Sequence, residues 1–493
     1  MEVGELKIVK GMIWNFFSYN SVSFFQLVFG VILARILAPE TFGIFTMAIS
    51  IIFFVSLLLE AGLGHPIIQG KHEIEKMANF MFLNGLIISL FFFVCLYAIA
   101  PFFAKYFMMR DLVFLLRVLG FSFVLYAFYV IQRCILLKRL EFRTLFFINN
   151  ISLFFSSIFA IILALLGKGV WALAGSYIID LLIKVILLWS AAEWKPSFRY
   201  DFKIARKMLY FGGYASSEAI LGWFINGVDK VILGRFLGLK LLGVYNIGYN
   251  FAMTPLNTIV VPFNTALYPA FCTLQENINE FRKYYLQYLS WIIFLMYPAC
   301  LLIFFLCPHI IIYFLGVKWI DSIVVVRCMI IQCFIASLVT INHEIFRALN
   351  RPDIPAKFLL VRIIFTVPVY FYYVRFGLLQ FCLGFLGLSL IFAPFNAFLC
   401  SKKLQMKRNE LWGFLRSFVV IANLLLTISI VILNYFFRHS WISLFSYLFL
   451  ICAVLGFYAA GFFFVEKEKM EKLKILISNF YNNPDSGTTI IQP

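Results

Sequence analysis

Charged residues are scarce in this sequence. They make up 13% of its 493 residues, whereas hydrophobic residues make up 63%. A soluble globular domain carries about 25% charged residues, and the mean hydropathy of this chain is +0.95. This balance excludes an ordinary soluble domain and is typical of a membrane protein.

The sequence also lacks the motifs of common catalytic and metal sites. It contains no Walker loop, no GxSxG and no HExxH sequence, and its five histidines are scattered. The ten cysteines include no CxxC pair and lie mostly within apolar runs, so neither a disulfide framework nor a zinc site is indicated. We therefore expect no enzyme, no metal and no cofactor.

Long apolar segments are abundant. About 20 apolar residues suffice to cross a hydrocarbon core of about 30 Å. The run that follows Lys7 and Lys10 continues to about Ala34, too far for a signal peptide, so we interpret it as a retained first helix. The sequence predicts an all-α polytopic membrane protein with about 14 transmembrane helices, at 12–34, 42–61, 79–103, 112–137, 144–166, 169–192, 209–233, 241–263, 285–314, 321–346, 357–375, 377–400, 411–436 and 441–465.

Basic residues are distributed unevenly among the connections. With the N-terminus in the cytoplasm, the inner connections and both tails carry 25 Lys and Arg, the outer connections carry nine, and the other seven of the 41 lie inside spans. Because basic residues accumulate on the cytoplasmic side, both termini are predicted to be cytoplasmic, in the inner (cytoplasmic) membrane of the cell. The net charge of +18 therefore indicates membrane orientation and not nucleic-acid binding.

One short segment occurs twice, about 200 positions apart. Residues 31–45 read VILARILAPETFGIF and residues 231–245 read VILGRFLGLKLLGVY, with six identities in register. Six predicted spans, an even number, separate the two copies, so both copies have the same orientation in the membrane. The alternative is that two apolar helices that end in arginine resemble each other by chance. The pattern predicts two parallel six-helix repeats, residues 1–195 and 196–405, then additional helices within 406–465 and a disordered cytoplasmic tail, 466–493.

Ionisable residues inside spans are the candidate functional residues, because they are costly in hydrocarbon and usually face a bundle interior or a wet cavity. Asp180 and Lys184 are spaced to pair on one helix face, so a purely structural ion pair is the alternative there. For Asp229 and Lys230 the alternative is an interfacial cap. Arg35 and Arg235 are better placed to anchor the outer rim at the headgroups. The remaining in-span candidates are Arg117, Glu218, Asn226 and Arg327.

Four segments resemble one family. They are ILARILAPETFGIFTMA, DKVILGRFLGLKLLGVYNIGYN, ALYPAFCTLQEN and IQRCILLKRLEFR, and they resemble the Wzx-type polysaccharide-export flippases of the MOP superfamily, from about Leu6 to about Val465. The resemblance implies two six-helix bundles that form a V around a central cavity, alternating access and no covalent chemistry. The implied partners are an undecaprenyl-diphosphate-linked oligosaccharide, membrane lipids, and the polymerase and export proteins of such a pathway.

The resemblance gives the in-span residues expected roles. Flipping the cargo to the outer leaflet requires fixed cations, because an unpaired charge is very costly in hydrocarbon. The residues expected to meet the diphosphate are Lys184, Arg117, Lys230, Arg327 and Asn226, with Lys184 favoured. The residues expected to bind a coupling ion are Glu218, Asp180 and Asp229.

Three other functions remain as alternatives. A lipid-II-type flippase shares the fourteen helices, but the LGRFLG and YPAF motifs favour the polysaccharide group. A cation-coupled multidrug exporter of the same superfamily usually lacks the last two spans. A polymerase or ligase of lipid-linked sugars would need a large outer loop, and every predicted outer connection is short.

Overall fold

The computed structural model describes residues 3–69, 74–192, 194–196, 220–224, 227–264, 277–349 and 353–406, with residues 267, 271, 275 and 351. Over residues 3–13, 15–16, 58–69 and 74–77 only the backbone is described. Predicted spans 13 and 14, the tail 466–493 and most of predicted span 7 lie outside the described residues. We name the end at which α1 ends and α2 begins the outer end, following the predicted topology.

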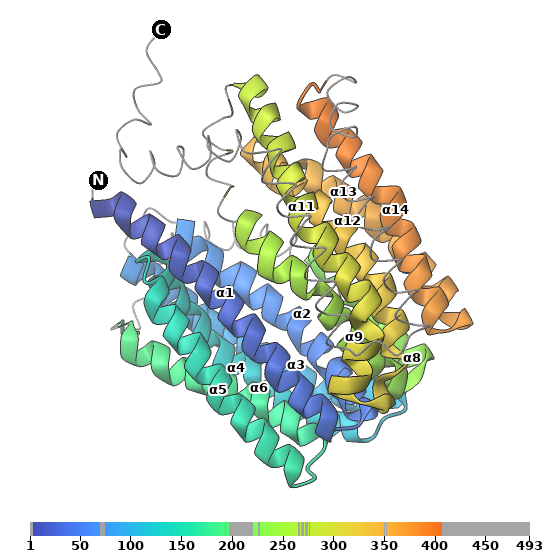
Figure 1. Ribbon diagram of the computed structural model, residues 1–493. Helices are drawn as coiled ribbons and strands as arrows, with labels where there is room; N and C mark the ends of the chain where they lie inside the picture. The colour runs from blue at the N-terminus through green and yellow to red at the C-terminus, as the bar shows by residue number, and fades with distance from the viewer. Residues whose placement is uncertain are drawn as a thin grey trace.

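The described residues are helical almost throughout (Figure 1). The N-terminal half contains α1 (Val3–Ile36), α2 (Pro39–Gln69), α3 (Ile74–Phe107), α4 (Asp111–Lys138), α5 (Phe142–Leu165) and α6 (Val170–Ala191). The C-terminal half contains α8 (Val228–Phe236), α9 (Gly238–Pro255), η1 (Leu256–Val260), α11 (Ile278–Ile310), η2 (Ile311–Leu315), η3 (Val317–Trp319), α12 (Ser322–Ala348), α13 (Asp353–Tyr373), η4 (Val374–Phe376) and α14 (Leu378–Lys403).

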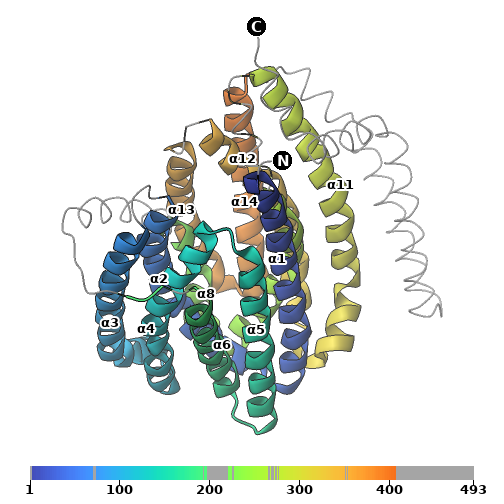
Figure 2. The same cartoon turned by 90° about the vertical axis from the view of Figure 1, so that its left-hand side faces the viewer.

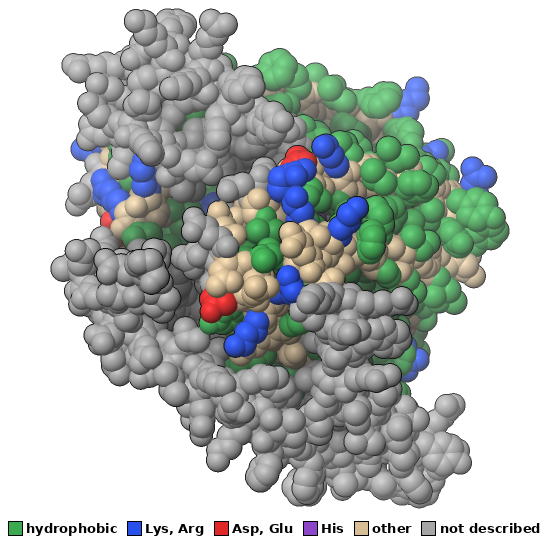
Figure 3. All heavy atoms as spheres, turned by 90° about the horizontal axis from the view of Figure 1, so that it is seen from above, with side chains coloured by type: hydrophobic (Ala, Val, Ile, Leu, Met, Phe, Trp, Pro, Cys, Tyr) green, Lys and Arg blue, Asp and Glu red, His purple; other side chains and the backbone are tan. Residues whose placement is uncertain are grey.

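Ten of the described helical segments are long and apolar enough to cross a membrane. They coincide with predicted spans 1–6 and 9–12, and large hydrophobic side chains such as Phe102 and Ile391 are 66% and 68% exposed. Seen from the end at which α1 begins, hydrophobic side chains cover much of the described surface, and basic ones gather near the middle of the view (Figure 3). The prediction of an all-α polytopic membrane protein is confirmed, with at least ten spans.

Glycine and proline explain where regular helix stops. Gly316, after η2, and Gly377, after η4, have φ values of +99° and +105°, a left-handed conformation that glycine adopts without strain. Pro255 ends α9, and the chain continues as the π-helix η1. Proline lacks the N–H that would continue the α-helical bonding pattern, and π-helical turns accommodate such interruptions.

Helix α2 lies where the two halves meet. It packs against α3, α4 and α6 of its own half and against α8 and α9 of the other half. Its residues Met47, Ala48 and Ile52 have no exposed surface. Helix α1 packs on α5 and also contacts η1 and η2 of the C-terminal half (Figure 2). The seam between the halves is therefore built on α1 and α2.

The duplicated segments touch each other across this seam. A Cβ atom at Gly43 would overlap the carbonyl oxygen of Leu239, and a Cβ atom at Gly243 would overlap the carbonyl oxygen of Pro39. Positions 39 and 239 are themselves counterparts in the duplicated segment. The contact is reciprocal, as in an interface related by a two-fold axis. The recurrence of glycine at position 43 of one copy and 243 of the other thus has a packing cause.

We expect Gly43→Ala to lower the melting temperature of the purified protein, because the added methyl group overlaps a backbone carbonyl that cannot rotate aside. Overpacking of this kind costs about 1–3 kcal/mol. Gly30→Ala is the matched control, since a Cβ atom there meets nothing within 4 Å. Thermal unfolding in detergent measures both variants. Equal melting temperatures for the two would contradict the proposed close crossing.

Candidate functional site

At the outer end, carbonyl groups in the last turn of α1 and that of Leu37, directly after it, accept hydrogen bonds from the other half. Lys318 Nζ donates to the carbonyl oxygens of Arg35, at 2.9 Å, and Leu37, at 2.7 Å. Trp319 Nε1 donates to the carbonyl oxygen of Ala34 at 2.9 Å. The last carbonyls of a helix have no intrahelical partner, and the negative end of its dipole favours a cation. We call residues 34–37 with Lys318 and Trp319 the outer clasp.

Burial reinforces the outer clasp. Trp319 has no exposed surface, and its ring packs edge-on against Phe42, with centroids 5.3 Å apart. Partial burial lowers the pKa of the Lys318 ammonium group from its ordinary value. Two carbonyl dipoles from α1 replace part of the water that this ammonium group would otherwise bind. The outer clasp thus combines a buried tryptophan with an exposed lysine at the contact between the halves.

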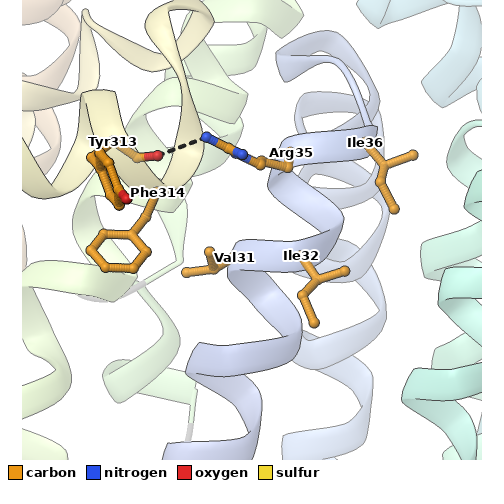
Figure 4. Close-up of a pocket in the computed structure, with 6 residues that line it drawn as sticks. All are labelled: Val31, Ile32, Arg35, Ile36, Tyr313 and Phe314. Atoms are coloured by element: carbon orange, nitrogen blue, oxygen red, sulfur yellow. Dashed lines mark hydrogen bonds between the residues drawn. The ribbon is translucent and has the colours of Figure 1, made fainter.

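The two duplicated arginines also reach across the seam. An Nη atom of Arg35 donates to the carbonyl oxygen of Tyr313, in η2, at 2.7 Å (Figure 4). The guanidinium group of Arg235 lies 5.3 Å from the centre of the Tyr106 ring, at the end of α3. Each arginine therefore contacts the outer end of the third helical span of the opposite half. Their expected contact with headgroups stays a prediction.

Lys184 and Asp180 form an ion pair on α6, with Nζ and Oδ2 2.6 Å apart, as their spacing predicts. Their side chains are 21% and 22% exposed, and α6 packs against α2, α4 and α5. Among the described residues, the second carboxylate oxygen of Asp180 is buried without a hydrogen-bond partner. The pair therefore lies inside the N-terminal half and retains unused hydrogen-bonding capacity.

Arg117 and Arg327 are counterparts in opposite halves, which the sequence analysis did not detect. They end the segments DLVFLLR, residues 111–117, and DSIVVVR, residues 321–327, which are 210 positions apart. The Arg117 guanidinium lies 4.2 Å from the centre of the Tyr97 ring, and that of Arg327 lies 5.5 Å from the Phe304 ring. Each arginine thus contacts the preceding helix of its own half, and the two are not brought together.

Asp229 and Lys230 point to different groups. Asp229, in the first turn of α8, is 1% exposed, and its Oδ2 accepts a hydrogen bond from the Tyr245 hydroxyl at 2.7 Å. Its Oδ1 has no partner among the described residues. Lys230 Nζ lies 5.5 Å from the centre of the Tyr249 ring. Asp229 is therefore a buried carboxyl group and not a headgroup-facing cap.

Glu218 and Asn226 lie outside the described residues, so their expected roles stay predictions.

A buried polar network in the C-terminal half also escaped the sequence analysis. Tyr285 donates to Asn342 Oδ1 at 3.0 Å, and Asn342 Nδ2 donates to Asn396 Oδ1 at 2.8 Å. Asn264 Nδ2 donates to the Thr340 hydroxyl at 3.2 Å. These bonds tie α11, α12 and α14 together, and Asn396 Nδ2 has no hydrogen-bond partner among the described residues. The signal in the sequence that could have revealed this network is the presence of asparagines inside apolar spans.

Comparison with known proteins identifies the family. Residues 32–324 match the family described as "Polysaccharide biosynthesis protein". The chain belongs to this family. The lipopolysaccharide biosynthesis protein WzxC of Escherichia coli (strain K12) is a relative with 23% identity over 377 residues, which cover 73% of this chain and 74% of WzxC. The Wzx-type resemblance of the sequence is thereby confirmed.

Solved structures establish the fold. The structure described as "Lipid II flippase MurJ, inward closed conformation" superposes with a TM-score of 0.72 at 15% identity, covering 92% of this chain and 99% of that one. An inward-facing multidrug-resistance MATE transporter of the MOP superfamily gives 0.62 at 14% identity, covering 79% and 96%. The solved structures thus show the MOP fold, and the family match makes the chain a multi-pass membrane transporter of polysaccharide biosynthesis and not an enzyme.

We expect Lys318→Met to loosen the outer clasp. Hydrogen bonds from a charged donor contribute about 1.5–3 kcal/mol, so the open population at the outer end is expected to rise about tenfold or more. The reporter is Leu37→Cys, because Leu37 is only 5% exposed. Its rate of reaction with a polar maleimide in detergent is followed by mass spectrometry of that peptide, which separates it from the native cysteines.

Lys240→Met, in the outer turn of the other copy, is the matched control for the Lys318 variant and should leave the labelling rate of the reporter unchanged. Lys240 is exposed. Equal labelling in the Lys318→Met and Lys240→Met backgrounds would show that the ammonium group does not hold the seam closed.

Proposed function

We propose that this protein flips a polyisoprenyl-diphosphate-linked oligosaccharide, with undecaprenol as the lipid, from the cytoplasmic to the outer leaflet of the inner membrane. The observation that carries the proposal is the outer clasp with the reciprocal glycine crossing, in a chain of the polysaccharide biosynthesis family. At its outer end the seam between the two halves is closed by the contact that the outer clasp forms. Such a contact has to break and re-form if the cargo leaves on that side.

The cargo explains why a transporter of this kind is needed. A diphosphate and a hydrophilic glycan cannot cross hydrocarbon unaided, whereas the lipid tail can remain in the bilayer. An inside-negative membrane potential contributes about 2.3 kcal/mol per charge per 100 mV, which favours outward movement of an anionic headgroup. The expected architecture is 14 spans in two parallel repeats that form a V, with both termini in the cytoplasm.

The proposed roles of the charged residues follow their surroundings. Lys184 is the first candidate for the diphosphate, because it is a cation inside a predicted span whose side chain is still 21% exposed and can therefore be reached by a ligand. Exchange of Lys184 between Asp180 and a phosphate would release a carboxylate able to take up a proton. Asp229 is a second proton candidate, since it is buried and Tyr245 holds only one of its oxygens.

A lipid-II-type flippase is the second candidate function. The likeness to the MurJ structure favours it over the multidrug exporter, since the TM-scores are 0.72 and 0.62. Both flippases would move a lipid-linked diphosphate, so the same cations would serve. The two functions differ in the sugar that the protein accepts, which a transport assay with each cargo separates.

We expect proteoliposomes containing this protein to expose a polyprenyl-diphosphate-linked oligosaccharide to a glycan-cleaving enzyme added outside. Lys184→Met is expected to slow exposure about tenfold or more, because loss of a charge-assisted hydrogen bond to phosphate costs at least about 1.5 kcal/mol. Lys168→Met, in the exposed turn between α5 and α6, is the matched control and should retain the wild-type rate.

The double variant Asp180→Asn/Lys184→Met separates binding from structure, because it removes both charges and leaves no unpaired carboxylate. If Lys184 meets the diphosphate, the double variant stays slow. Recovery of the wild-type rate would instead make the ion pair purely structural. Exposure of lipid II but not of longer oligosaccharides would favour the second function, and no exposure of any lipid-linked sugar would contradict both.

A further inference from the structure

We propose that the outer seam between α1 and η2 is a binding site for an anionic phospholipid of the outer leaflet, with Arg35 as the contact to its phosphate. The site is a pocket of about 530 Å³. It is lined by Val31, Ile32, Arg35 and Ile36 of α1 and by Tyr313 and Phe314 of η2. Figure 4 shows Arg35 and Val31 of α1 facing Tyr313 and Phe314 of η2, while Ile32 and Ile36 point to the other side of α1 in this view. Both halves of the protein therefore form the walls.

The charge of the pocket selects an anion. Arg35 is its one ionisable lining group besides the Tyr313 phenol, and within the described part of the chain no carboxylate pairs with Arg35. The guanidinium group has five N–H donors, of which one hydrogen bond, to the Tyr313 carbonyl, is formed among the described residues. The Lys318 ammonium group, on the Arg35 carbonyl, adds a second positive charge nearby. A planar guanidinium fork matches the oxygens of a phosphate.

The remaining walls suit an acyl chain. Ile32 and Ile36 are each 37% exposed, and Tyr313 and Phe314 are 68% and 51% exposed. The pocket lies at the ends of two candidate membrane spans, Phe17–Ile36 and Ile278–Leu315, where headgroups meet hydrocarbon and where aromatic residues concentrate. A ligand that carries a phosphate next to an apolar chain matches a pocket that places a cation next to apolar side chains. A phospholipid at this depth of the membrane has both a phosphate and an apolar chain.

The counterpart of Arg35 does not form a second such site. Arg235 lies over the Tyr106 ring, 5.3 Å from its centre, so its guanidinium group packs on the end of α3, whereas that of Arg35 lines a pocket. Position 236 carries an exposed phenylalanine where position 36 carries isoleucine. The duplicated chain therefore provides a matched pair of positions, with a pocket at one and a ring at the other.

Binding at the seam has a consequence for transport, and this consequence alone rests on the proposed function. Because α1 and η2 belong to different halves, the pocket exists only while the outer end is closed. A ligand that binds one state better shifts the population toward that state. A phospholipid in this pocket would therefore oppose outward opening until the halves separate and release it.

Native mass spectrometry of the purified full-length protein tests the proposal, with phosphatidylglycerol as the probe and phosphatidylcholine as the neutral-headgroup comparison. We expect one phosphatidylglycerol molecule to be retained preferentially. Arg35→Gln should weaken this binding about tenfold, and Arg235→Gln should leave it unchanged. Ile36→Glu, which places an acid beside Arg35, should weaken it similarly, whereas Phe236→Glu should not.

The Ile36 and Phe236 variants keep both arginines and alter exposed positions, so they test the pocket even if Arg35→Gln fails to fold. Equal retention of the two lipids, wild-type binding by both Arg35→Gln and Ile36→Glu, or equal losses in the two halves would overturn the proposal. The readout is lipid binding and not transport. Failure of the phospholipid site therefore leaves the cargo proposal standing, and failure of the cargo proposal leaves the site standing.

Discussion

The close crossing of α2 and α9 is the constraint on which the seam depends. Gly43 and Gly243 let two backbones approach until each glycine lies against a carbonyl group of the other helix. At that separation the end of α1 comes within reach of η3, so Lys318 and Trp319 can bond its last carbonyls. A side chain at either glycine would push the halves apart and remove those bonds. Packing at two positions thus permits the polar contacts that close the outer end.

Polar groups elsewhere strengthen each half internally. The network around Asn342 joins three helices of the C-terminal half, and Gln132 Nε2 donates to the carbonyl oxygen of Trp194 within the N-terminal half, at 3.2 Å. Each of these bonds joins elements within one half, although Asn396 Nδ2 and Gln132 Oε1 have no hydrogen-bond partner among the described residues. The seam, in contrast, combines the packing of α2 against α8 and α9 with a small number of hydrogen bonds. This distribution favours movement of two stiff halves about their contact over deformation within either half.

Much of the fold could be predicted from the sequence, because apolar run length and the bias of basic residues follow directly from bilayer physics. The Asp180–Lys184 pair could also be predicted, since helical spacing alone sets it. The duplicated glycines were visible, but identity in register does not reveal that the two copies touch. The outer clasp could not be predicted from the sequence, because Lys318 and Leu37 are far apart in it. The relation of Arg117 to Arg327 was hidden because the offset between repeats changes from 200 to 210 residues.

The central claim is that the outer seam opens during transport. Glu40 and Lys240 are exposed counterparts in the outer turns of opposite halves, so spin labels introduced there as unnatural amino acids report the distance across the seam. Pulsed electron paramagnetic resonance in nanodiscs should give one short distance for the protein alone and an additional longer population when the lipid-linked oligosaccharide is added. A single short distance under both conditions, in a sample that flips the cargo, would contradict the account.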